Sequence, residues 1–172
     1  LGYKYSDKWI LNTEIEIEHT DEIYNEFMYV DYLASEALSY RFGLSLIPMG
    51  ITNELHEPIY FNSVNRPEVE KYLIPTTWRE IGLGISGKID NANLRYQAYV
   101  FNGFASVNGS NVLGGSNGLR NGRQKGAEST INTPNLSAKI DFYGIQGLRL
   151  GFSGYFGRSQ AADEVDAIEG SD

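Results

Sequence analysis

Apolar and polar residues alternate with a period of two along several segments of the chain. In segment 135–143, apolar and polar positions alternate as Asn135, Leu136, Ser137, Ala138, Lys139, Ile140, Asp141 and Phe142. A period of two is the pleat of a β-strand. Because a continuous apolar band lies on one side and charges lie on the other, the pattern is typical of a transmembrane β-barrel with a polar interior.

The alternation and the turn residues between the segments predict the arrangement of the strands. We expect seven antiparallel strands, at 9–19, 26–34, 37–47, 79–89, 93–101, 135–143 and 147–157. Short turns at 35–36, 90–92 and 144–146 alternate with longer loops at 20–25, 48–78 and 102–134. Outer-membrane barrels have this asymmetry, with short periplasmic turns and long external loops. The predicted fold is therefore all-β, an antiparallel transmembrane β-barrel.

Seven strands are an incomplete barrel. Single-chain bacterial barrels have an even number of strands, and an open sheet in lipid would leave unpaired backbone groups that cost several kcal/mol each. The chain begins with Leu1 rather than Met, and 159–172 falls where an external loop belongs. We therefore expect 1–172 to be the N-terminal part of one β-barrel domain.

The composition of the 172-residue chain agrees with this fold and excludes other classes. Aromatic residues make up 13%, including 12 Tyr, as the girdles of a barrel require. The mean hydropathy of -0.33 and the lack of a long apolar run exclude a membrane-spanning helix. The absence of Cys excludes disulfides and thiolate chemistry, and the net charge of -8 argues against a nucleic-acid partner.

Several short motifs in 42–87 occur together: Pro48-Met49-Gly50, His56-Glu57-Pro58, Asn65-Arg66-Pro67, Ile74-Pro75 and Trp78-Arg79-Glu80-Ile81-Gly82. With Tyr99–Gly103, this segment resembles the outer-membrane porins of the phosphate-selective porin O and P family, especially its branch in Bacteroidetes-type Gram-negative bacteria. The resemblance implies a 16-stranded barrel, usually a homotrimer, in contact with outer-membrane lipid and lipopolysaccharide. It also implies that the loop after the third strand narrows a pore for small anions or other hydrophilic solutes.

The composition of loop 48–78 also favours a constriction. Its four prolines argue for order, and its aromatic residues Tyr60, Phe61, Tyr72 and Trp78 require burial against the barrel wall. The alternative is a solvated extracellular lid. In the constricted form, we expect the pore to be lined by Glu54, His56, Glu57, Arg66, Lys71, Arg79 and Glu80.

The polar phase of the strands predicts which charges face the lumen. These are the acids Glu14, Glu16, Glu18, Asp31, Glu80 and Asp141 and the bases Arg41, Lys88, Arg95, Lys139 and Arg149. A pore selective for phosphate needs an excess of Arg and Lys, so this balance does not predict phosphate selectivity. The acids at 14–18 form either a cation path or a solvated strand face. The opposite phase predicts lipid-facing Leu94, Val100, Leu136, Ile140, Leu148, Leu150 and Phe152.

No motif indicates an enzyme, a cofactor or a metal site. His56-Glu57 lacks the second histidine of a zinc-protease helix, and a hydrogen-bonded turn before Pro58 explains it better than a metal site with Glu54. Loop 102–134, rich in Gly, Asn and Ser, is expected to be external. Its Arg120, Arg123 and Lys125 either contact lipopolysaccharide or solute, or are simply solvated.

The sequence thus predicts a passive diffusion channel of the outer membrane. Two alternatives remain. The first is an accessory or structural barrel, with a plugged pore, in a larger outer-membrane complex. The second is a secreted β-sandwich that binds a ligand through its loops.

Overall fold

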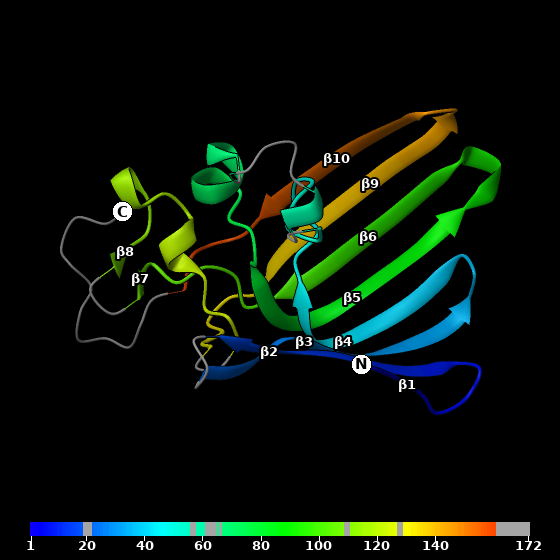
Figure 1. The fold of residues 1–172 in the computed structure, drawn as a ribbon, viewed down its shortest axis with the longest axis horizontal. Coiled ribbons are helices and arrows are strands. Elements are labelled where there is room, and N and C mark those ends of the chain that lie inside the picture. Colours follow the sequence, from blue (N-terminus) through cyan, green and yellow to red (C-terminus); the bar gives the residue numbers. More distant parts are fainter. Residues whose placement is uncertain are drawn as a thin grey trace.

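The computed structural model describes residues 1–18, 22–55, 58–60, 65, 67–108, 111–126 and 129–160. In this part of the chain, eight strands form one antiparallel sheet in the order β1-β2-β3-β4-β5-β6-β9-β10 (Figure 1). They are β1 (Gly2–Lys4), β2 (Trp9–Glu18), β3 (Glu22–Ser35), β4 (Leu38–Leu46), β5 (Arg79–Ile89), β6 (Leu94–Phe101), β9 (Asn135–Ile145) and β10 (Leu148–Phe156). The prediction of an all-β antiparallel fold is confirmed. The predicted strands are all present, and β1 is additional.

The short turns lie at one end of the sheet and the long connections at the other (Figure 1). The helical turn η3 (Asp90–Ala92) joins β5 to β6 and ends at Asn93 with a φ of 50°, in the left-handed region. Two predicted connections are wrong in extent. Ile145 still pairs with Leu148, so the turn after β9 is shorter than 144–146. Glu18 pairs with Glu22, where β3 begins, so β3 occupies most of the predicted loop 20–25.

The two long connections contain local structure of their own. The connection between β4 and β5 includes η1 (Pro58–Tyr60) and η2 (Val69–Leu73), and that between β6 and β9 includes β7 (Val107–Asn108), β8 (Asn111–Val112), η4 (Gly115–Asn117) and η5 (Arg120–Gly122). Among the described residues, no helix has the length and apolar character needed to cross a membrane.

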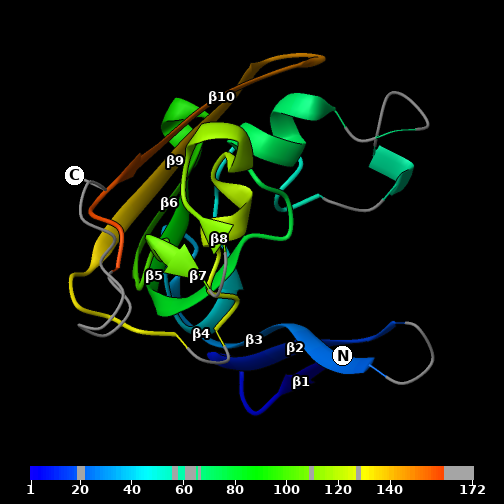
Figure 2. The same cartoon turned by 90° about the vertical axis from the view of Figure 1, so that its left-hand side faces the viewer.

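The sheet curves into an arc that is not closed. Seen from the end with the long connections, it runs from β1 round to β10, and the long connections lie on its concave side (Figure 2). Strands β1 and β10 are the two edges of the arc.

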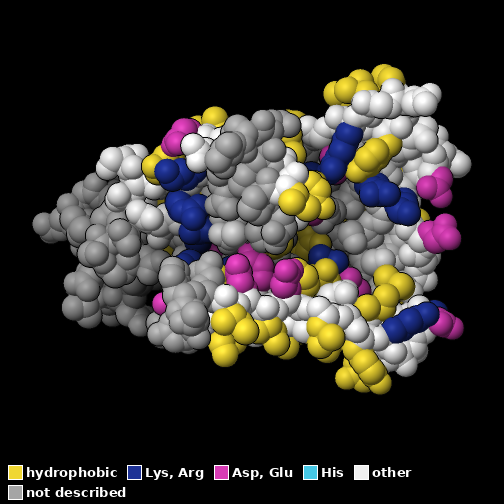
Figure 3. Space-filling model, viewed as in Figure 1, with side chains coloured by type: hydrophobic (Ala, Val, Ile, Leu, Met, Phe, Trp, Pro, Cys, Tyr) yellow, Lys and Arg dark blue, Asp and Glu magenta, His cyan; other side chains and the backbone are white. Residues whose placement is uncertain are grey.

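The two faces of the sheet have an inverted distribution of side chains. On the concave face, Lys139 and Asp141 are each only 4% exposed. Between them in sequence, Ile140 points to the convex face and is 50% exposed, and Phe152, its partner on β10, is 78% exposed. The space-filling view onto the concave side shows charged side chains in its hollowed middle (Figure 3). The covered face is therefore polar, and the open face is apolar.

A small aromatic core closes the loop end of the concave face. It consists of Ile47, Trp78, Tyr99, Phe101 and Phe104, each at most 3% exposed. Trp78 stacks on Phe104 with ring centroids 4.3 Å apart. Phe104 belongs to the connection 102–134, so part of this predicted external loop packs into the interior.

Candidate functional site

The charged cluster on the concave face is built from neighbouring strands and one long connection. The register places Gln97 of β6 opposite Lys139 of β9, and Arg95 opposite Asp141, so the four side chains share one face. Glu54, from the connection between β4 and β5, reaches this face. Its Oε1 accepts a hydrogen bond of 2.8 Å from Gln97 Nε2, and its Oε2 forms an ion pair with Lys139 Nζ.

Backbone contacts hold the same connection against the sheet. The Gly50 N–H donates to Ser153 Oγ of β10 at 3.1 Å, and the Gly50 carbonyl accepts from Lys139 Nζ at 3.2 Å. Lys139 therefore binds both Gly50 and Glu54, and residues 50–54 cross the concave side of β6, β9 and β10. The start of the predicted constriction loop thus lies against the polar face of the sheet.

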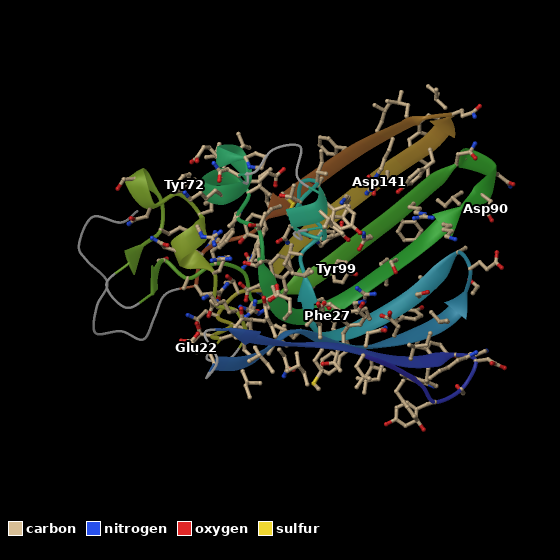
Figure 4. The ribbon with its side chains drawn as sticks, in the orientation of Figure 1. Glu22, Phe27, Tyr72, Asp90, Tyr99 and Asp141 are labelled. Atoms are coloured by element: carbon tan, nitrogen blue, oxygen red, sulfur yellow. The ribbon has the colours of Figure 1, made fainter. Side chains whose placement is uncertain are left out.

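An ion pair and two contacts with an aromatic ring orient further charges of this face. Arg149 donates two hydrogen bonds to the Asp141 carboxylate, at 3.0 and 2.9 Å. Arg95 and Arg149 both lie over the Tyr143 ring, 5.0 and 5.5 Å from its centroid. Such forked and stacked geometries orient a guanidinium strongly. Asp141 and Tyr99 are labelled in Figure 4, on neighbouring strands of this face.

A second forked pair lies further along the sheet. Arg41 of β4 donates to both oxygens of Asp31 of β3, at 2.8 and 2.9 Å, and stacks 3.6 Å from the centroid of Tyr29. Ion pairs therefore hold charged side chains of the concave face both on β3 and β4 and on β9 and β10.

A cavity of about 440 Å³ opens beside Glu54 on the concave face. Its charged lining consists of the bases Lys88, Arg95, Lys139 and Arg149 and the acids Glu36, Glu54 and Asp141, which is four bases against three acids. The arrangement suits hydrated ions or small polar solutes. Within the described residues, no group of three or more His, Cys, Asp or Glu side chains could hold a metal ion.

Of the other predicted constriction residues, Arg79 and Glu80 do not line this cavity. Arg79 Nη1 lies 2.8 Å from Glu26 Oε2, and both side chains are buried. Glu26 is the extra residue of a β-bulge, since Glu14 pairs with Phe27 and the next residue, Ile15, pairs with Asn25.

Glu80 is 1% exposed and serves as an acceptor for the loop-end packing. It accepts hydrogen bonds from Trp78 Nε1 at 3.1 Å, Asn102 Nδ2 at 2.7 Å and the Gln124 backbone N–H at 3.0 Å. Its carboxylate thus ties together the ends of both long connections.

The remaining predicted residues either do not line the cavity beside Glu54 or fall outside the described residues. Lys71 is exposed on η2. The pKa of Lys71 is raised, first by a hydrogen bond with Tyr72 and second by the negative charge of Glu68. On β2, Glu14 is exposed and Glu16 is half-buried, and Glu18 is the last residue of this strand. His56, Glu57 and Arg66 fall outside the described residues.

Two structural roles were not predicted from the sequence. Arg123, expected to be solvated or to contact lipopolysaccharide or solute, is buried and donates to the Thr76 carbonyl at 2.6 Å and to Thr77 Oγ1 at 2.7 Å. Gln160 is fully buried, and its side chain bonds the backbone of Asn132 and Thr133. Neither contact has a local sequence signal, because each joins segments far apart in the chain.

The convex face carries a second concavity of about 770 Å³, which we call the outer groove. Its lining is almost entirely apolar and comprises Trp9, Val30, Tyr32, Tyr40, Arg41, Phe42, Leu83, Gly84, Ile85, Ala98, Val100 and Leu136.

Comparison with known proteins identifies a longer relative. An uncharacterized protein of Aquifex aeolicus (strain VF5) is 38% identical over 170 residues, which cover 94% of this chain and 38% of that protein. The chain therefore spans well under half the length of this relative. No protein-family model matches the chain, and no solved structure matches it.

Proposed function

We propose that the chain forms part of the wall of an outer-membrane β-barrel that acts as a passive diffusion channel for small hydrophilic solutes or ions. The observation that carries this proposal is the inverted sheet, with buried charges on the concave face and exposed apolar side chains on the convex face. In water, the reverse distribution is favoured, because burying a charge costs free energy and burying an apolar side chain lowers it. A lipid exterior and a wet interior reverse both preferences.

The open arc supports a larger barrel. Strands β1 and β10 each have one unpaired edge in the described sheet, and such edges are not tolerated in lipid. The Aquifex aeolicus relative is much longer than the chain, so a homologous full-length polypeptide has residues enough to supply more strands. The sixteen strands implied by the resemblance to phosphate-selective porins belong to this proposal.

In this proposal, solutes move along the charged cluster, beside the docked segment 50–54. Solutes would pass the cavity beside Glu54, where four bases face three acids. This small surplus favours a weakly selective pore over a dedicated phosphate path. The loop-end aromatic core, which fills part of the concave side, favours the second candidate, an accessory barrel whose pore is plugged.

Conductance of the full-length protein in a planar lipid bilayer tests the proposal. A channel gives stepwise, ohmic current, and the Glu54→Ala variant gives a larger or noisier current because residues 50–54 lose their side-chain attachment to Lys139. A detergent-extracted, heat-modifiable protein without current would identify the plugged barrel. A protein that stays in solution without detergent and shows no heat-modifiable migration would refute membrane insertion.

A further inference from the structure

The pairing register explains the shape of the outer groove. One row of convex-face side chains runs through paired positions Trp9, Tyr32, Tyr40, Ile85 and Ala98. The adjacent row begins at Val30 and ends at Leu136. The groove lies between the two rows, where the small Ala98 leaves space among larger neighbours.

The groove rises from the turn end of the sheet toward its loop end. Trp9 is the first residue of β2, next to a short turn, whereas Leu136 is the second residue of β9, next to a long connection. From β2 the groove crosses β3, β4, β5 and β6 to reach β9, which is five strand-to-strand steps. At about 4.8 Å per step these span about 24 Å.

The extent of the groove along the membrane normal matches the depth of one lipid leaflet. Barrel strands tilt by about 40° from the membrane normal, so a path of about 24 Å perpendicular to them descends about 15 Å along that normal. Half of a hydrocarbon core of about 30 Å is the same depth. An acyl chain lying in the groove would thus cross one leaflet.

The end of the groove near the short turns, at Trp9, has the aromatic and basic side chains of a lipid headgroup site. Trp9 and Tyr32 lie there with ring centroids 4.8 Å apart, and such rings favour the headgroup level. Lys8 Nζ lies 6.0 Å from the Tyr32 centroid. Among the described residues, no acidic side chain forms an ion pair with Lys8, so its charge is free to meet an anion.

We propose that the outer groove binds one acyl chain of a membrane phospholipid, whose phosphate pairs with Lys8. The inference rests on the proposed membrane location and adds a specific lipid site to it. The groove supplies an apolar path of leaflet depth and a cation at one end, which are the two parts that a phospholipid complements.

Quenching of tryptophan fluorescence by brominated lipid tests this site. The full-length protein is reconstituted in phosphatidylcholine vesicles containing a minor fraction of phosphatidylglycerol brominated in its acyl chains, and in matched vesicles with brominated phosphatidylcholine. The difference between the protein and its Trp9→Phe variant isolates Trp9, which is 49% exposed, whereas Trp78 is 2% exposed in the concave-side core.

We expect Trp9 quenching to exceed the value for random mixing of lipids. Ala98→Leu fills the groove and should lower quenching to the random value. Ala138→Leu is the matched control, because Ala138 pairs with Ala98 on the same face but lies outside the lining. Lys8→Gln should reduce the preference for brominated phosphatidylglycerol about fivefold, the effect of one lysine at a membrane surface.

Other results would overturn the proposed lipid site, and one of them would also refute the membrane location. If Trp9 in the unmodified protein is quenched only to the value for random mixing of lipids, the groove contacts bulk lipid and binds no specific phospholipid. Trp9 shielded from both brominated lipids in a conducting protein would show that a second copy covers the groove. Unquenched Trp9 together with absent conductance would refute the membrane location, and the lipid site with it.

Discussion

Placing the same charge on adjacent residues of β5 tests the assignment of the two faces. Ile85 lies one residue past the middle of β5 (Arg79–Ile89) and points to the convex face, where it is 39% exposed. Ser86 points to the concave face and lines the 440 Å³ cavity. We compare Ile85→Arg with Ser86→Arg in the full-length protein.

The expected free-energy difference follows from the environment of each side chain. An Arg facing lipid near the midplane of a barrel costs about 2–4 kcal/mol, which lowers the folding equilibrium constant about 30-fold to nearly 1,000-fold. At position 86 the guanidinium can enter the cavity and remain hydrated. We therefore expect Ser86→Arg to cost about 1 kcal/mol or less, as at an ordinary surface position.

Reversible unfolding in guanidinium chloride, with the protein in lipid vesicles, measures both variants. Heat-modifiable migration on gels reports the folded fraction independently of fluorescence. Equal unfolding free energies for the two variants, with neither below the unmodified protein by more than about 1 kcal/mol, would contradict a lipid-facing convex surface. A larger loss for Ser86→Arg than for Ile85→Arg would reverse the assigned faces.

Three further predictions concern the charged cluster and the orientation of the sheet. Glu54→Gln should lower the unfolding free energy by about 2–3 kcal/mol in denaturant titration, because buried Lys139 loses its counter-charge. Arg95→Glu changes the cavity from four bases and three acids to three bases and four acids, and should shift the reversal potential in a salt gradient toward cations. An epitope tag at Gly115 should be stained on intact cells, whereas a tag at Gly147, in a short turn, should be stained only after permeabilisation.

Each of these predictions has a control or a contrary outcome. Asp7→Asn removes the exposed Lys4–Asp7 pair and should leave the unfolding midpoint unchanged, in contrast to Glu54→Gln. A reversal potential that ignores Arg95→Glu would place the cavity off the ion path. Staining of the Gly147 tag alone on intact cells would invert the topology.

The sequence by itself determined the strands and the division of residues between two faces. The alternation through Lys139, Ile140 and Asp141 reports a β pleat directly, since neighbouring side chains on an extended backbone point to opposite faces. Turn chemistry located the short connections to within a few residues. The alternation does not predict the three-residue strand β1, because this strand is too short to show a period.

Only the tertiary structure decided how the long connections meet the sheet. Glu54 and Lys139 are 85 residues apart, and their contact depends on the curvature of the arc and on the register of β6 with β9. The bulge that accompanies the Glu26–Arg79 pair, and the burial of Arg123 against Thr76, have the same origin. Local periodicity is set by the backbone of one strand, whereas these contacts are set by how strands and connections pack together.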